Sequence, residues 1–169
     1  LITGARGFQQ TFYKPLAPVL PQGAPSGVNL TRPKVIQPRP ENVRFGRARG
    51  GGGNEAARAY AYQVTGGAEK AVYVNGVEFE GVRNGILLDA KRASARGSFY
   101  DISGTDRFTQ QVKIPSVLTQ ARRQIGSVRG EGFKGIQWEV ADPDVAQQLN
   151  RLFDQQNIRI SVIHNPALR

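Results

Sequence analysis

Two acidic residues and one lysine are spaced so that they could act together on a phosphodiester bond. Asp89 and Lys91 follow the apolar run Ile86-Leu87-Leu88, which predicts a buried strand, and residues two apart in a strand point to the same face. Glu80 ends the preceding predicted strand. Two carboxylates can hold a hard divalent cation, and a lysine beside them can orient a water bound to it. The alternative is a strand that ends in an ordinary solvated ion pair.

The length and the charge limit the class of protein. The chain has 169 residues and a net charge of +10, which is enough for one well-packed domain. Residues 1–53 hold eight of the 23 Lys and Arg residues but only one of the 13 acids, so the excess of positive charge is concentrated there. A basic chain attracts nucleic acid, an acidic protein or an anionic membrane surface, and the sign of the charge alone does not choose among them.

Scarce residue types exclude several kinds of site. The chain has no cysteine, which excludes disulfides, a thiol nucleophile and a thiolate zinc site. One histidine, His164, argues against a Ser-His-Asp hydrolase and a multi-histidine zinc centre, and we interpret it as a surface or packing residue. No segment approaches the ~20 continuous apolar residues that span a bilayer, so no membrane insertion is expected. The chain also has no methionine, and we interpret it as a piece of a larger polypeptide.

The composition divides the chain at about residue 54. Residues 1–53 are predicted to be a Pro/Gly/Arg-rich linker or N-terminal arm, because the prolines of residues 14–40 favour extended backbone and the glycines at 50–53 break regular structure. The Arg/Gly run could remain solvated or contact a nucleic-acid backbone. It is not a phosphate-binding loop, because no G-K-[ST] follows it. Residues 54–169 are predicted to form the folded domain.

Local signals in residues 54–169 predict eight elements in the order α-β-β-β-α-β-α-β. Asn54 and Asp142 are capping residues, Pro115 can begin a helix, and two Asn-Gly pairs are hairpin turns. The predicted helices are residues 55–64, 115–125 and 143–156. The predicted strands are residues 70–74, 77–81, 86–91, 136–140 and 158–163. This order predicts an α/β (α+β) fold, a mixed sheet with helices on its faces.

Five short motifs stand in order on these elements. They are Tyr62-Gln-Val-Thr-Gly66, Val77-Glu-Phe-Glu-Gly81, Leu87-Leu-Asp-Ala-Lys91, Gln120-Ala-Arg-Arg-Gln124 and Gln137-Trp-Glu-Val140. The topology and the motifs resemble the restriction-endonuclease-like PD-(D/E)xK superfamily, and more narrowly the fifth restriction-endonuclease-fold toxin family of bacterial polymorphic toxins. The resemblance runs from about residue 60 to residue 162. The family typically has Phe-Asp-Gly and Glu-Ala-Lys where this chain has Phe79-Glu-Gly81 and Asp89-Ala-Lys91. The longer acid, glutamate, therefore stands in the first motif of this chain and in the second motif of the family.

The resemblance implies roles for the residues at the centre of the site. Glu80 and Asp89 would ligate Mg²⁺ or Mn²⁺, with the Ala90 carbonyl as a candidate third ligand. Lys91 would orient the attacking water or stabilise charge on the phosphate. Gln124 would touch the substrate or Lys91, or else belong to an ordinary polar helix face.

Further candidates surround this centre: Glu55, Gln120, Arg122 and Arg123. Glu55 resembles the first-helix acid of related nucleases, and it is equally well a solvated acid favoured by the helix dipole. Gln120 shares a helix face with Gln124. The two arginines are phosphate contacts or solvent-facing charges. Glu78 either joins the site or is an edge-strand charge. Trp138 and Phe153 are expected in the core.

The function that we expect is a metal-dependent nuclease toxin, an endonuclease that acts on DNA in preference to RNA. As the C-terminal effector part of a larger secreted carrier, it would be secreted or injected and act in the target-cell cytoplasm. A producing cell would need an immunity protein, acidic because this domain is basic. One alternative is a non-catalytic basic nucleic-acid-binding module. Another is a structural tail of a secretion machine with residues 1–53 as a docking arm.

Overall fold

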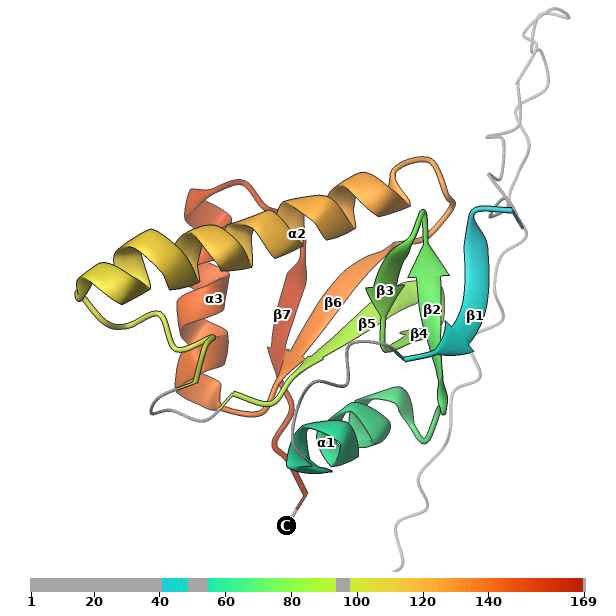
Figure 1. Ribbon diagram of the computed structural model, residues 1–169, viewed down its shortest axis with the longest axis horizontal. Coiled ribbons are helices and arrows are strands. Elements are labelled where there is room, and N and C mark those ends of the chain that lie inside the picture. Colours follow the sequence, from blue (N-terminus) through green and yellow to red (C-terminus); the bar gives the residue numbers. More distant parts are fainter. Residues whose placement is uncertain (1–40, 49–54, 94–97, 169) are drawn as a thin grey trace, which may run out of the picture. The chain divides into compact units, whose positions relative to one another are not determined.

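The computed structural model of the chain describes residues 41–48, 55–93 and 98–168. These belong to the second of two compact units, residues 35–169. The described residues form a mixed α/β fold with two sheets and three α-helices (Figure 1), so the predicted class is confirmed. The helices are α1 (Glu55–Thr65), α2 (Ile114–Val128) and α3 (Pro143–Gln155). The predictions for residues 1–40 and 49–54 lie outside the described residues. Among the described helices, none has the length and apolar character to cross a membrane.

The strands form two separate sheets rather than the one mixed sheet predicted. The first sheet is antiparallel, in the order β1 (Val43–Arg47), β2 (Lys70–Val74) and β3 (Val77–Phe79). The second has the order β4 (Gly81–Arg83), β5 (Ile86–Lys91), β6 (Gly135–Val140) and β7 (Ser161–His164). Strand β4 is antiparallel to β5, whereas β5, β6 and β7 run parallel. The polypeptide passes from one sheet to the other at Glu80.

Both predicted hairpin turns are confirmed. Asn75 and Gly76 join β2 to β3 with φ angles of 48° and 79°, and Asn84 and Gly85 join β4 to β5 with φ angles of 54° and 82°. Two consecutive residues with positive φ are the signature of the type I′ turn, which matches the twist of paired strands. The two Asn-Gly pairs therefore fix the local path on both sides of Glu80.

The predicted strand over residues 77–81 is broken at Glu80, where β3 ends and β4 begins. A side chain at Gly81 would place its Cβ 2.9 Å from Cγ2 of Thr65 on α1, closer than carbon atoms approach one another. The glycine allows α1 to lie directly against β4. The break holds Glu80 where the two sheets meet, instead of within a continuous ladder.

Strand β1 lies in the stretch that the sequence assigned to the linker. It pairs with β2 from Val43 opposite Val74 to Arg47 opposite Lys70. Glu131 holds the residue before this strand, Asn42, beside the turn after β2. The Glu131 Oε1 accepts hydrogen bonds from the side-chain amides of Asn42 (3.1 Å) and Asn75 (2.9 Å). Residues 43–47 thus join the folded part, and its predicted start at Asn54 is too late. Their composition hid the strand, because glycine is depleted in strands.

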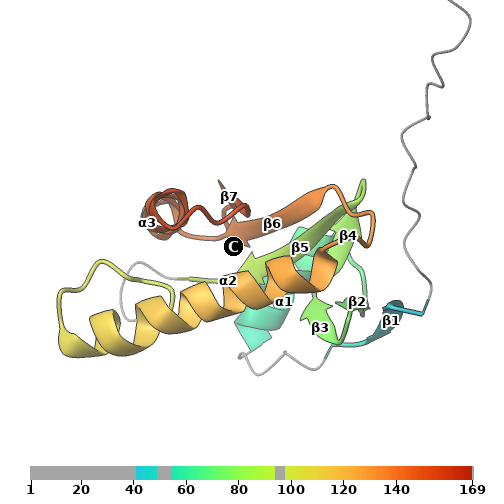
Figure 2. The ribbon, with the colours of Figure 1, turned by 90° about the horizontal axis from the view of Figure 1, so that it is seen from above.

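Helices cover both faces of the second sheet (Figures 1 and 2). Tyr60 and Val64 of α1 pack with Leu88 on one face. On the other face, α2 and α3 share one core cluster with Leu87 and Trp138. Trp138 and Phe153 are 0% and 1% exposed, which confirms them as core residues. Because Leu87 and Leu88 point to opposite faces, Asp89 and Lys91 share the α2 face with Leu87.

Two element boundaries differ from the prediction. A π-helical turn over Thr109–Lys113 precedes α2, and the Ile114 N–H bonds to the Thr109 carbonyl. The wider turn stands just before Pro115, which has no N–H for the regular α-helical pattern. Strand β7 starts at Ser161, opposite Gln137, so residues 158–160 lead into the sheet without pairing. Helix α3 begins as predicted, since Asp142 accepts hydrogen bonds from two backbone amides of its first turn.

Candidate active site

Asp89 and Lys91 form a buried ion pair on the α2 face of β5. The Lys91 Nζ lies 2.5 Å from the Asp89 Oδ1, and their side chains are 4% and 5% exposed. The alternative of a solvated ion pair at the end of a strand is therefore wrong. Burial disfavours the charged lysine, but the nearby Asp89 carboxylate outweighs it and raises the pKa of Lys91 above its ordinary value. Lys91 stays protonated at neutral pH.

Glu80 brings a second carboxyl to Asp89. It is half-buried at the break between the sheets, and its Oε2 accepts a hydrogen bond from the Ala90 N–H at 3.1 Å. Burial, and after it the charge of Asp89, raise the pKa of Glu80 to about 8. Two acids placed this closely cannot both ionise easily without a cation between them. The Ala90 N–H thus bonds to Glu80, and the metal-ligand role expected for the Ala90 carbonyl stays a prediction.

Two glutamines of α2 hold the Asp89 carboxylate. The Gln124 Nε2 donates to the Asp89 Oδ2 at 2.5 Å, and the Gln120 Nε2 donates to the same oxygen at 3.2 Å. Gln124 is 1% exposed and also accepts a hydrogen bond from the Trp138 Nε1 at 2.7 Å. The structure therefore places Gln124 against Asp89 rather than against Lys91. Its role is to fix the orientation of the carboxylate.

Aromatic rings enclose the Lys91 ammonium. Its Nζ lies 4.5 Å from the centre of the Trp138 ring and 5.0 Å from that of Tyr100, distances at which a ring face attracts a cation. The Tyr100 hydroxyl also donates to the Gln120 Oε1 at 3.2 Å. Sequence reasoning missed Tyr100, because it lies in a polar stretch without periodicity. It also assigned Trp138 to packing alone.

The acids stand in a groove of about 990 Å³. Helix α1 contributes Ala57 and Ala61 to its lining, and α2 contributes Gln120 and Arg123. Besides Lys91, five described basic residues line the groove, namely Arg47, Arg58, Lys70, Arg92 and Arg123. Four of these lay outside the predicted site, since separate segments bring them together.

The remaining predicted residues divide between the groove and the surface. Arg123 lines the groove, whereas Arg122 points elsewhere and donates to the Gln156 Oε1 at 3.1 Å. Glu78 lines the groove and accepts a hydrogen bond from the Tyr73 hydroxyl at 3.1 Å. Glu55 is exposed at the start of α1 and does not line the groove, which fits a solvated helix-start acid. His164 is exposed at the end of β7.

The donor set suits a hard divalent cation with few protein ligands. Within residues 41–48, 55–93 and 98–168, no group of three or more His, Cys, Asp or Glu side chains is arranged to hold a metal ion. Glu80 and Asp89 nevertheless offer carboxylate oxygens side by side, and the raised pKa of Glu80 marks a position where a cation would relieve repulsion. Mg²⁺ is commonly bound through one or two carboxylates, with water completing its shell.

Another buried acid, Glu139 of β6, belongs to a structural network on the α1 face. Arg83 forms an ion pair with it, and the side-chain amides of Gln137 and Asn165 donate to its oxygens. The Tyr60 hydroxyl donates to the Asn165 carbonyl at 2.6 Å. This network ties α1 and the segment after β7 to the sheet, and it leaves no carboxylate oxygen of Glu139 without a donor.

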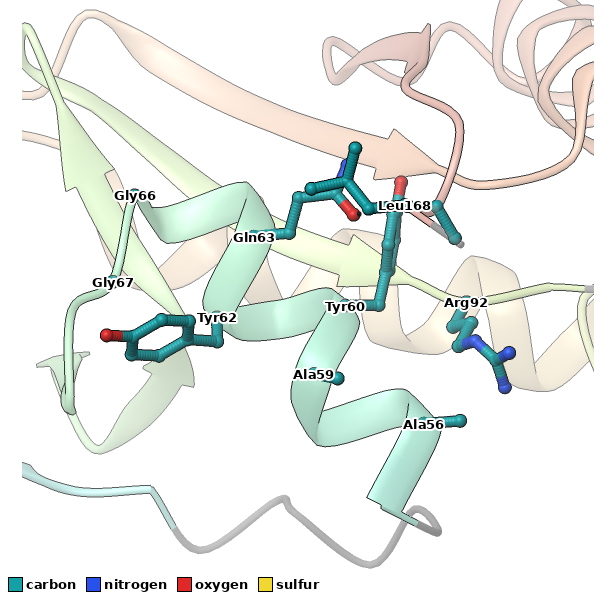
Figure 3. A pocket seen from close by; sticks show the side chains of 10 residues that line it. Ala56, Ala59, Tyr60, Tyr62, Gln63, Gly66, Gly67, Arg92 and Leu168 are labelled. Carbon is teal, nitrogen blue, oxygen red and sulfur yellow. Dashed lines mark hydrogen bonds between the residues drawn. The ribbon is translucent and has the colours of Figure 1, made fainter.

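A hollow of about 570 Å³ lies between α1 and the segment after β7 (Figure 3). Ala56, Ala59, Tyr60 and Gln63 of α1 face it, with Arg92 and Leu168 on its border. Among the described residues that line it, none is acidic and none belongs to the predicted site. The hollow is therefore separate from the carboxylate site, although Tyr62 and Arg92 border both.

Comparison with known proteins adds no relative to this description. No family model, curated protein or solved structure matches the chain. The chemistry of the site therefore has to be argued from its own residues.

Proposed function

We propose that this domain is a metal-dependent nuclease that hydrolyses phosphodiester bonds, with Glu80, Asp89 and Lys91 at its centre. The observation that carries the proposal is the buried Asp89–Lys91 pair beside a second carboxyl in a groove with cationic residues. Burying charged groups costs free energy, and a cluster of perturbed acids in a cleft is typical of catalytic sites. The restriction-endonuclease-like topology and family membership are part of this proposal, supported by the five motifs and by the position of Asp89 and Lys91 on β5.

Glu80 and Asp89 would hold Mg²⁺ or Mn²⁺. When bound, the cation neutralises charge on the scissile phosphate and makes its water more acidic. Gln120 and Gln124 keep the Asp89 carboxylate in one orientation by donating to its Oδ2. Lys91 has three N–H donors, of which one serves Asp89. The others can orient a water or donate to a phosphate oxygen as negative charge develops there.

A non-catalytic nucleic-acid-binding module is the competing function, and the cationic residues of the groove favour it as well. Such a module binds through charge alone and has no use for a desolvated carboxylate pair. The buried acids are therefore the reason to prefer catalysis.

The biological setting belongs to the same proposal. A net charge of +10 suits a polyanionic substrate, DNA in preference to RNA, and an acidic immunity partner. The absence of cysteine is compatible with a target-cell cytoplasm, where thiols stay reduced. The resemblance to polymorphic toxins supports an effector carried by a larger secreted polypeptide.

The deciding experiment is incubation of the purified chain with supercoiled plasmid and with total RNA, in Mg²⁺, in Mn²⁺ and in EDTA. We expect metal-dependent cleavage that falls by at least about a hundredfold in Asp89→Ala and in Lys91→Met. Asp154→Asn, an exposed acid on α3, is the matched control and should cleave like the wild type. Circular dichroism verifies that each variant folds. Intact substrates under every metal, with binding that weakens as salt rises, would replace the nuclease by the binding module.

A further inference from the structure

Arg47 belongs to the catalytic groove although it comes from the arm-like part of the sequence. It ends β1, opposite Lys70 of β2, and it lines the groove that holds Glu80 and Asp89. The Tyr73 hydroxyl donates to the Arg47 carbonyl at 2.6 Å. The backbone of Arg47 is thereby fixed on the first sheet, while its side chain is exposed. The structure thus brings Arg47 to the groove from outside the region that carries the family resemblance.

The basic residues of the groove are available to a ligand. Among the described residues, the ion pairs are Lys91–Asp89 and Arg83–Glu139, so Arg47 forms no ion pair with a described carboxylate. The other basic residues of the groove come from α1, β2, the end of β5 and α2. Four acids line the groove as well, namely Glu69, Glu78, Glu80 and Asp89. Cations contributed by five separate segments suit a long polyanion, which places phosphates on both sides of the one that is cut.

Arg44 on the same strand provides an internal comparison. Its guanidinium carbon lies 4.9 Å from the centre of the Tyr73 ring, in a cation–π contact, and it does not line the groove. Arg44 and Arg47 are three residues apart, so their side chains leave opposite faces of β1. The two arginines carry equal charge on one strand and differ in whether they reach the groove.

We propose that Arg47 binds a backbone phosphate of the nucleic-acid strand away from the scissile bond, which makes β1 part of the substrate site. The inference rests on the proposed nuclease function, because the strand is the ligand that the groove would hold. A guanidinium suits this task, since its fork of N–H groups pairs with two phosphate oxygens. Such a contact positions the strand and carries no sequence preference.

The test compares Arg47→Ala with Arg44→Ala in the full chain, using a DNA duplex and its separated strand as probes in EDTA. One lost phosphate contact lowers the slope of log affinity against log salt by about 0.9 for duplex or 0.7 for single strands. At 0.1 M salt this amounts to a loss of about five- to eightfold in affinity, relative to a 1 M reference. Arg44→Ala should change affinity by less than about twofold. Arg47→Lys keeps the charge and should retain most of the slope.

Cleavage kinetics separate this inference from the proposed function. If Arg47 binds a remote phosphate, Arg47→Ala raises KM and leaves kcat within about twofold, because the chemical step does not use it. Equal losses of affinity in the two alanine variants would overturn the inference, since they would reflect net charge alone. A wild-type protein that binds but never cleaves, with binding that depends on Arg47, would overturn the nuclease and leave the phosphate contact in place.

Discussion

Replacing Gln124 by leucine tests how much the hydrogen bonds of Gln124 to Asp89 and Trp138 contribute to the stability of the domain. Leucine is similar in volume and suits a site that is 1% exposed, so packing changes little. The substitution removes the donor to the Asp89 Oδ2 at 2.5 Å and the acceptor of the Trp138 Nε1 at 2.7 Å. The indole N–H is left buried without its partner, and Asp89 keeps the hydrogen bonds from Lys91 and Gln120.

The expected cost follows from these two contacts. A buried donor without an acceptor costs about 1–3 kcal/mol, and a hydrogen bond to a charged group contributes about 1.5–3 kcal/mol. The extra apolar burial of leucine offsets part of the sum, which leaves a destabilisation of about 2–4 kcal/mol. For a domain of this size, that lowers Tm by about 8–16 °C.

The assay is urea unfolding at pH 7, followed by tryptophan fluorescence, with Gln120→Leu as the matched control. Gln120 is half-buried and its two hydrogen bonds are longer, each 3.2 Å, so its loss should cost less than about 1 kcal/mol. Gln124→Leu should also lower kcat, because the Asp89 carboxylate is freer to rotate. Equal stability of the two leucine variants would refute the account of Gln124 as the main support of Asp89.

Two further predictions concern Glu80 and its neighbour. The pKa of Glu80 is raised to about 8, so its contribution to stability is complete below its ordinary pKa and is lost as pH rises through 8. In EDTA, the free energy of unfolding of Glu80→Gln should therefore rise by about 1–3 kcal/mol relative to the wild type between pH 5 and pH 8. The gain is less than the full pKa shift implies because Glu80 is partly exposed. Mg²⁺ should reverse the difference, and parallel pH profiles of the two proteins in urea unfolding would contradict this. Gly81→Val should destabilise the domain by about 1–3 kcal/mol and reduce cleavage, because its Cβ would stand 2.9 Å from Thr65. The control is Gly126→Ala, because a Cβ at Gly126 meets no atom within 4 Å. Wild-type stability and activity in Gly81→Val would show that α1 can move aside at no cost.

Features with a local cause could be predicted from the sequence. The Asn-Gly turns, the Asp142 cap and the buried strand β5 each depend on a few consecutive residues, and each is confirmed. The strand period of two placed Asp89 and Lys91 on one face. Gln124 was found only through the resemblance, since nothing in its neighbourhood distinguishes it from an ordinary polar position.

Features with a non-local cause escaped prediction. Strand β1 exists because β2 and Glu131, both distant in the chain, bind it, whereas its own residues include Gly46 and two arginines. The break at Glu80 depends on the contact between Gly81 and Thr65. The basic residues of the groove come from separate segments, and no sequence period connects them.

The break at Glu80 has a mechanical consequence. Glu80 is the joint between two sheets, and Asp89 is built rigidly into one of them. A small rotation of the first sheet against the second changes the separation of the two carboxylates while both hydrogen-bonded ladders stay intact. Substitutions in the packing of the first sheet, such as at Val72 or Phe79, can therefore adjust the metal preference of the proposed site from a distance. The spacing of the acids therefore depends on the packing between the two sheets, and it can be tuned without altering either acid.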